Sequence, residues 1–532
     1  MIAKSKSAFS LWFICDLIVL FLPIYLIINK VIKYTHGVFI YPFDDTFIHL
    51  KIADNLLKGN WGINSTEFVS ASSSILYTMI LAVARIFSHS ALVPLMVNCL
   101  SGILILIALH FWLKKHFLNS FAQLIIIAFA IVLTPLALLV VSGMEHTLQC
   151  LFSFLFMFYF SDWLSETKRL DRTRIPFKII LFAILTASIR YEGLFLIVTA
   201  CLLLLVYKKF FDAFLLGMIA MAPVIVFGLI SVSKGNYFLP NSVLVKSSSF
   251  NYSSPVTFLY DIVFDKLLYP GNGLATLATQ KLILAIPLLF FLFRKHLADS
   301  YFFILIFLFC ATLLQLSFAS TGYLYRYEAY LFFCFTLITS VLFFEYGMYL
   351  YDSLKSSLLK IISFIIAFFL LFPVVLRSVS AFDKTPKACI NIYDQQYQMA
   401  MFTKQYFNES NIALNDIGAM AYFTKANIID LWGLANIEVT RSKKFHYWNP
   451  EFLDSLCKSN RVEFAIVYDT WFDDQLLKKW TKVATWQIRN NVICGDSKVC
   501  FYSLAASSKG LLYQRLRNFE SKLPASVSRK YY

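Results

Sequence analysis

The sequence predicts an α-helical polytopic membrane protein with a soluble α/β domain at its C-terminal end. Of the 532 residues, 59% are hydrophobic and only 15% are charged, and the mean hydropathy is +0.67. Soluble domains are about 45–50% apolar and about 25% charged. Long apolar segments fill the first 376 residues, whereas 35 of the 156 residues at 377–532 are charged, against 43 before them. This composition excludes a soluble enzyme, a disordered chain and a nucleic-acid-binding protein.

About eleven apolar segments are candidate membrane spans, because a spanning helix needs about 20 apolar residues. They run over residues 9–33, 91–113, 119–141, 144–161, 177–190, 193–207, 211–231, 281–293, 300–318, 329–348 and 358–376. The first is too long for the core of a signal peptide. Residues 75–87 are short and include Arg85, so we expect an interfacial helix there.

Clusters of Lys, Arg and His between these segments orient the chain. Three of them are Lys114-Lys115-His116, Lys208-Lys209 and Arg294-Lys295-His296. Because basic residues collect in cytoplasmic loops, the N-terminus is predicted inside and the C-terminus outside, and the net charge of +16 is read first as a topology signal. We expect a multi-pass protein of a bacterial inner (cytoplasmic) membrane.

The domain organisation follows from this topology. A transmembrane domain is predicted at 1–376, with outer loops at 34–90 and 232–280. A periplasmic or extracytoplasmic domain is predicted at 377–532, where short runs such as 411–415, 427–431 and 464–468 resemble strands.

Cysteines give one further expectation for the C-terminal domain. Cys494 and Cys500 enclose a short loop flanked by strand-like residues, and an oxidising compartment would allow a disulfide between them. The six cysteines in the apolar segments are expected to be packing residues.

Two adjacent carboxylates, Asp44 and Asp45, follow the first span, and His49 lies one helical turn beyond Asp45. Such a pair can deprotonate an acceptor hydroxyl or hold a divalent ion near a phosphate. The structural alternative is that one of the two caps a helix that runs to Lys58 and ends at Gly59. A cap needs only one side chain, so the second Asp is left without a structural reason.

Two further motifs lie at predicted outer ends of spans. Glu145 belongs to a Ser-x-x-Glu pattern, which is also a capping box. Arg190 and Glu192 join two short apolar segments, where charges are costly unless they are paired or line a polar cavity. A structural Arg190–Glu192 pair and a phosphate-binding role for Arg190 remain equal alternatives.

Other polar candidates are Asn241 and Lys246 in the second outer loop, and Arg326 at the outer end of a later span. An aromatic belt with snorkelling charges would also explain them. No glycine-rich phosphate loop, zinc-ligand cluster or Ser/His/Asp pattern is present, so the sequence gives no support for nucleotide hydrolysis or metalloprotease chemistry.

Taken in order, these motifs resemble the bacterial GT-C glycosyltransferases that use polyprenyl-phosphate sugars, in particular the group containing the mycobacterial terminal arabinofuranosyltransferase. The matching stretches are Asp44-Asp45-Thr46-Phe47-Ile48, Asn55-Leu56-Leu57-Lys58-Gly59-Asn60-Trp61-Gly62, Gly143-Met144-Glu145-His146-Thr147, Arg190-Tyr191-Glu192-Gly193, Leu239-Pro240-Asn241, Ile417-Gly418 and Asp430-Leu431-Trp432-Gly433-Leu434. The sequence departs from the family at Tyr191, where the family has proline, and at the inserted His146.

The resemblance implies an inverting glycosyltransferase that moves a sugar from a polyprenyl-phosphate donor to a glycan or glycolipid acceptor of the cell envelope, in lipopolysaccharide or cell-wall biogenesis. Asp44 would be the general base, with Asp45 as its partner or as a ligand of a divalent metal. Donor phosphate or sugar would contact Arg190, Glu192, Lys246, Arg326, Glu145, His49 and Asn241. The alternatives are a transporter or flippase of lipid-linked sugars, for which an internal repeat would be expected, and a non-catalytic envelope-assembly scaffold.

Overall fold

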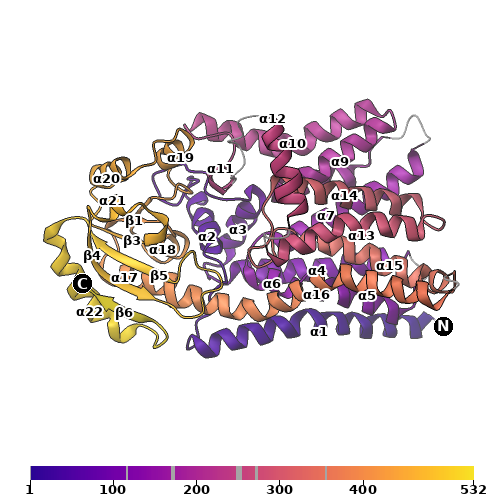
Figure 1. The fold of residues 1–532 in the computed structure, drawn as a ribbon, viewed down its shortest axis with the longest axis horizontal. Coiled ribbons are helices and arrows are strands. Elements are labelled where there is room, and N and C mark those ends of the chain that lie inside the picture. The colour runs from indigo at the N-terminus through magenta and orange to yellow at the C-terminus, as the bar shows by residue number, and fades with distance from the viewer. Residues whose placement is uncertain (1, 116–117, 169–173, 247–254, 270–272, 354–355) are drawn as a thin grey trace. The chain divides into compact units, whose positions relative to one another are not determined.

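The computed structural model describes residues 2–115, 118–168, 174–246, 255–269, 273–353 and 356–532, and Figure 1 labels their elements. The chain forms two compact units. The first contains Met1–Leu26, Leu95–Ile225 and Ser249–Asp383, and the second contains Ile27–Pro94, Val226–Ser248 and Lys384–Tyr532. The second unit therefore joins parts of both predicted outer loops to the C-terminal region. The predicted domain limits at 376 and 377 stay a prediction.

Every predicted apolar segment is helical. The helices are α1 (Ile2–Tyr34), α4 (Val93–Leu113), α5 (Ser120–Leu133), α6 (Leu136–Ser142), α7 (His146–Thr167), α8 (Phe177–Ile189), α9 (Gly193–Val206), α10 (Phe210–Ser233), α13 (Leu274–Phe293), α14 (Asp299–Phe318), α15 (Ala329–Ser353) and α16 (Ser357–Ile392). In the described part of the chain, eight helices are long and apolar enough to cross a membrane, or nine if the bent pair α5 and α6 forms one span.

The sequence predicted about eleven spans, but only eight or nine candidate spans are long and apolar enough in the described part of the chain. Helices α8 and α9 have 13 and 14 residues, which is short for a crossing of about 20 residues. Helices α5 and α6 meet at 52°. The chain is a multi-pass membrane protein, and its predicted orientation stays a prediction. The shorter elements of the first unit are α12 (Pro255–Tyr260) and a π-helical segment, Asp261–Leu268.

Two predicted helices of the first loop are present in the second unit. Helix α2 spans Asp45–Leu56, and Gly59 follows with a φ of 86°, a left-handed conformation that favours glycine. Helix α3 spans Ile75–Phe87, where Ser74 Oγ caps the backbone N–H of Tyr77. The second loop contributes α11 (Asn241–Lys246).

A six-stranded mixed sheet forms the centre of the C-terminal region, as predicted for an α/β domain. Its strands are β1 (Asn411–Leu414), β2 (Asn427–Asp430), β3 (Phe464–Val467), β4 (Thr481–Gln487), β5 (Lys498–Ser503) and β6 (Ser528–Tyr531). They lie in the order β2-β1-β3-β5-β4-β6. β1 pairs in parallel with β2 and β3, while β3 with β5, β5 with β4, and β4 with β6 pair antiparallel.

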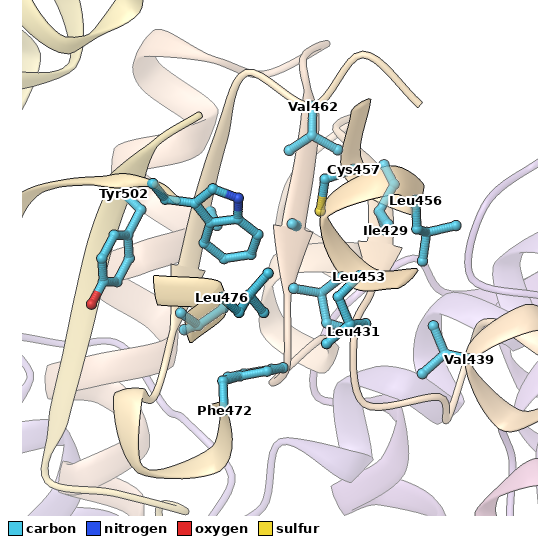
Figure 2. Packing of buried hydrophobic residues seen from close by; sticks show 14 of the residues in the cluster. Ile429, Leu431, Val439, Leu453, Leu456, Cys457, Val462, Phe472, Leu476 and Tyr502 are labelled. Carbon is cyan, nitrogen blue, oxygen red and sulfur yellow. The ribbon is translucent and has the colours of Figure 1, made fainter. Parts of the chain in front are cut away.

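Helices pack on both faces of this sheet. On one face, α17 (Gln398–Tyr406) and α22 (Lys509–Phe519) place Phe402 and Phe519 against Trp486 of β4. On the other face, α19 (Ile437–Lys444), α20 (Pro450–Ser459) and α21 (Asp474–Leu477) cover the half formed by β2, β1 and β3. Figure 2 shows the apolar residues packed there, among them Leu453 and Leu476. Because successive strand residues point to opposite faces, each buried strand needs an apolar cover on both sides.

The predicted Cys494–Cys500 disulfide is not formed, because both residues are free thiols. Cys494 Sγ lies 3.4 Å from Gln396 Oε1, and Cys500 Sγ lies 3.4 Å from Thr485 Oγ1. The loop between them contains Gly495, whose Cα packs so closely against Trp471 that an added Cβ would lie 2.4 Å from the indole ring. The loop is therefore fixed by packing and hydrogen bonds.

Candidate active site

Asp44 holds the N-terminus of a helix that lies far away in the sequence. Its Oδ2 accepts the backbone N–H of Gly418 at 2.5 Å, and its Oδ1 accepts that of Ala419 at 2.7 Å. Both donors belong to the first turn of α18 (Gly418–Phe423), whose N–H groups have no partner within the helix. Asp44 precedes α2, but its side chain does not cap that helix. The sequence predicted a cap here, and the structure shows that a different helix is capped.

A second carboxyl, that of the partly buried Asp416, interacts with Asp44. Asp416 Oδ2 also accepts bonds from Gln396 Nε2 at 2.7 Å and from Tyr468 Oη at 2.8 Å. Burial raises the pKa of both carboxyls, and the negative charge of Asp416 raises the pKa of Asp44 further. Asp45, half-buried in the first turn of α2, adds a third negative charge beside them. We call Asp44, Asp45 and Asp416 the carboxylate cluster.

Sequence reasoning missed Asp416, although it directly precedes the quoted Ile417-Gly418 motif. It also missed Gln396 and Tyr468, which have no local pattern that marks them as polar partners. All three contact one another: Gln396 Nε2 donates to Tyr468 Oη at 2.9 Å. Gln396 and Tyr468 therefore hold the carboxyl of Asp416 in place through hydrogen bonds.

The first loop has two further anchors within the same unit. Arg85 of α3 forms a bidentate ion pair with Asp54 of α2, at 2.6 and 2.8 Å, and reaches the hydroxyl of Tyr422 in α18 at 3.4 Å. Asn64 pairs with Ile428 of β2: its Nδ2 donates to the carbonyl at 2.9 Å, and its Oδ1 accepts the N–H at 3.0 Å. These contacts hold Asp44 and Asp45 in a fixed position relative to α18.

His49 is buried away from solvent, and its Nδ1 lies 3.2 Å from both Ser72 Oγ and Thr78 Oγ1. These contacts join α2 to Ser72, which precedes α3, and to Thr78 of α3 itself. The assignment of His49 to the donor stays a prediction.

Asn241 is fully buried, and in the described part of the chain neither atom of its carboxamide has a hydrogen-bond partner. The buried hydroxyls of Ser70 and Ser242 also have no hydrogen-bond partner among the described residues. The backbone N–H of Asn241 donates to the carbonyl of Ser70 at 3.0 Å. Buried polar groups are nearly always bonded, so these atoms are candidates for hydrogen bonds to a ligand or to water. Lys246 ends α11, and its side chain lies outside the described residues.

In the first unit, Arg190 binds two other predicted site residues, Glu145 and Glu192. Its Nη1 donates to Glu145 Oε1 at 2.5 Å, and its Nε and Nη2 donate to the two oxygens of Glu192 at 2.9 and 2.6 Å. Glu145 does not form the capping box with Ser142, whose Oγ accepts the N–H of Met144 instead. Two carboxylates thus neutralise Arg190, which favours the structural alternative for this residue.

Arg326 is buried, and its guanidinium carbon lies 4.7 Å from the ring centroid of Tyr323 and 5.0 Å from that of Tyr327. The turn before it has positive φ at Gly322 and at residues 323–325. Glu328 holds this strained turn by accepting the N–H of Gly322 at 2.8 Å and by pairing with Arg377 at 2.9 Å. The Tyr327 ring also lies 5.3 Å from Arg190, so one ring connects the two guanidinium groups.

Within the described residues, no group of three or more His, Cys, Asp or Glu side chains has a geometry that could hold a metal ion. The carboxylate cluster offers carboxyls that share hydrogen bonds with backbone and with each other. A metal-binding role for Asp45 has no further support from these contacts.

The fold and these clusters define a polytopic helical membrane protein with a C-terminal mixed α/β domain. Among the solved structures that share this fold over nearly the whole chain are two of ArnT from Cupriavidus metallidurans. The apo structure has a TM-score of 0.54 and 11% identity, and covers 95% of this chain and 99% of that one. The structure bound to undecaprenyl phosphate has the same TM-score and identity, and covers 93% and 98%. The predicted fold class, a polytopic helical membrane region followed by a C-terminal α/β domain, is confirmed.

A sequence-family model described as a domain of unknown function (DUF8728) matches residues 390–502. This range includes most of the sheet, together with Asp416 and α18. No curated protein matches the chain.

Proposed function

We propose that this protein is an integral-membrane glycosyltransferase that moves a sugar from a polyprenyl-phosphate donor to a cell-envelope glycan on the outer side of the membrane. The observation that carries the proposal is the fold likeness to ArnT across 95% of the chain, which includes a structure holding undecaprenyl phosphate. The order of the sequence motifs supports the same class independently.

The carboxylate cluster supplies the base for this reaction. An acceptor hydroxyl attacks the anomeric carbon, the carbon–oxygen bond to the phosphate breaks, and the phosphate leaves on the lipid. We assign the proton of the hydroxyl to Asp45, because both oxygens of Asp44 already accept backbone N–H groups. Asp44 is then a positioning residue that fixes the start of α2. This assignment exchanges the roles that the sequence predicted for the two residues.

Arg326 is the cation proposed for the donor phosphate. Its planar guanidinium lies against the rings of Tyr323 and Tyr327, and a pre-organised Arg suits bidentate contact with phosphate oxygens. Arg190 is less suited because Glu145 and Glu192 already bind it. Asn241, with a buried carboxamide open to a partner, is proposed to bind a sugar or phosphate oxygen.

The test compares cells that lack the gene with cells that carry it, using mass spectrometry of envelope glycans and of polyprenyl-phosphate sugars. Loss of the gene should cause the donor to accumulate and leave one envelope glycan truncated. Wild-type protein should restore the glycan, while Asp45→Asn should reduce transfer by about 10²-fold or more. Glu409→Gln, an equivalent change at an exposed carboxylate, should restore it fully.

Thermal unfolding of each purified variant separates catalysis from folding. Asp45→Asn should unfold at nearly the temperature of the wild type. Full restoration of the glycan by Asp45→Asn would show that Asp45 is not the base. Donor that moves across vesicle membranes without any transfer would identify a flippase instead.

A further inference from the structure

One face of the sheet is covered over only half of its width. Helices α19, α20 and α21 cover the side of β2, β1 and β3, and their apolar cluster ends at Cys500 and Tyr502 of β5. The same face continues over β4 and β6, where every second residue is polar. In register across the strands, Thr485 pairs with Lys530 and Gln487 pairs with both Lys498 and Ser528.

This uncovered half is hollow. A groove of about 390 Å³ lies over it, and its charged lining residues are Asp469, Lys482, Asp496, Lys498, Arg529 and Lys530. Four side chains are cationic and two are carboxylates, so positive charge is in excess. We call this site the basic groove.

The two carboxylates of the basic groove are already hydrogen-bonded. Asp469 pairs with Lys482 at 2.6 Å and accepts the hydroxyl of Tyr502 at 2.8 Å, and Asp496 accepts the hydroxyl of Thr470 at 2.7 Å. In the described part of the chain, Lys498 and Lys530 form no ion pair with a carboxylate, and both are exposed. Arg529 is paired with Glu520 at 2.9 Å, and Lys482 is paired with Asp469, so the excess positive charge comes from Lys498 and Lys530.

We propose that the basic groove binds an acidic oligosaccharide. Lys498 and Lys530 would contact its anionic groups, while Gln487, Ser528 and the paired carboxylates exchange hydrogen bonds with its hydroxyls. The ring of Tyr532 lies 4.9 Å from Lys530 Nζ and 5.4 Å from Lys482 Nζ, so it helps to hold these two cations at the groove. The identification of this oligosaccharide as the acceptor rests on the proposed function. Its binding in the basic groove is independent of that function.

A flat anionic lipid surface fits the groove less well. Lipid headgroups bind clusters of basic side chains that project from a surface, and the attraction is of long range and weakly directional. Here the lysines lie on strands at the sides of a hollow that also contains carboxylates and neutral hydrogen-bonding groups. Such a mixed lining matches a discrete polar ligand.

The test measures binding to the purified full-length protein in detergent, with no donor present. The probes are tetragalacturonate, which is acidic, maltotetraose, which is neutral, and vesicles that contain 30% phosphatidylglycerol. The variant is Lys498→Gln with Lys530→Gln. The control is Lys425→Gln with Lys509→Gln, two exposed lysines outside the groove.

Tetragalacturonate should bind the wild type and the control equally, and the groove variant at least tenfold more weakly, because charged hydrogen bonds are lost. Its binding should weaken with added salt. The proposal is overturned if both variants bind alike, if maltotetraose binds as tightly, or if only the vesicles bind. Since no donor is present, binding can be retained while glycosyl transfer fails, and the two proposals are judged separately.

Discussion

The carboxylate of Asp44 and the backbone of Gly418 are in direct contact although 374 positions separate them in the sequence. The approach is so close that a Cβ at position 418 would lie 2.1 Å from the carbonyl oxygen of Asp44. The contact thus joins two motifs that the sequence shows as separate, the paired Asp of the first loop and the late Ile-Gly.

Gly418→Ala should therefore destabilise the protein, by about 2 kcal/mol or more, because the added methyl group forces Asp44 away from α18. Gly510→Ala is the matched control, since a Cβ there meets nothing within 4 Å. Thermal unfolding in detergent measures both. Equal unfolding temperatures for the two variants would contradict the close contact.

Stability should fall as the pH rises from about 4, because of Asp44 and Asp416. Their pKa values are raised in the folded state, so the folded protein binds more protons than the unfolded chain and loses stability until the pH exceeds the folded pKa values. In Asp416→Asn, position 416 cannot lose a proton. The unfolding temperature of this variant, relative to the wild type, should rise between pH 4 and pH 8. If the difference in unfolding temperature between Asp416→Asn and the wild type is the same at pH 4 and pH 8, the pKa of Asp416 is not raised by folding.

Arg190→Ala should cost about 3–5 kcal/mol, because it leaves Glu145 buried beside Glu192 without their shared cation. Glu192→Gln should cost less, because the contact between Arg190 and Glu145 is retained. Chemical or thermal unfolding gives the order. If Arg190→Ala is as stable as the wild type but needs far more donor, then Arg190 binds phosphate and its pairing is secondary.

Asn241→Leu should keep or raise stability, since it replaces a buried carboxamide that has no described partner with an apolar side chain of similar size. The same variant should lose glycosyl transfer if the carboxamide binds substrate. Unfolding temperature and product formation are measured on one preparation. A lower unfolding temperature would show that the carboxamide has a structural partner.

Lys443 should react with an amine-acylating reagent at unusually low pH. Its Nζ lies 3.2 Å from the ring centroid of Trp432, and burial lowers its pKa to about 8, while Asp430 opposes the shift. The labelling rate, followed by mass spectrometry, should have its midpoint near pH 8, against about 10.4 for an ordinary lysine. Asp430→Asn should move that midpoint lower still. A labelling midpoint above pH 10 would show that burial does not lower the pKa of Lys443.

Local patterns predicted the elements well. Helices α2 and α3 and strands β1, β2 and β3 lie where apolar spacing, Gly59 and short β-type runs indicated them. These signals lie within a few residues of one another. They therefore predict the local element independently of how distant parts of the chain pack.

The partners of the charged side chains were not predictable in the same way. Glu145 fits a local capping box, but in the structure it binds Arg190, because a charge-assisted bond in a buried site is stronger than an ordinary cap. Asp44 fits a cap of α2 and instead caps α18. Such choices depend on which distant segment packs beside the side chain, and one sequence does not contain that information.

The contact between Asn64 and Ile428 has a further consequence, for self-association. β2 and β6 are the edge strands of the sheet, and an exposed edge can pair with a strand of another molecule. Asn64 satisfies both backbone groups of Ile428 as a neighbouring strand would. The other edge is only four residues long and carries Arg529 and Lys530. At Ile428 and along the short, positively charged β6, the two edges therefore offer little free backbone to a strand from another molecule.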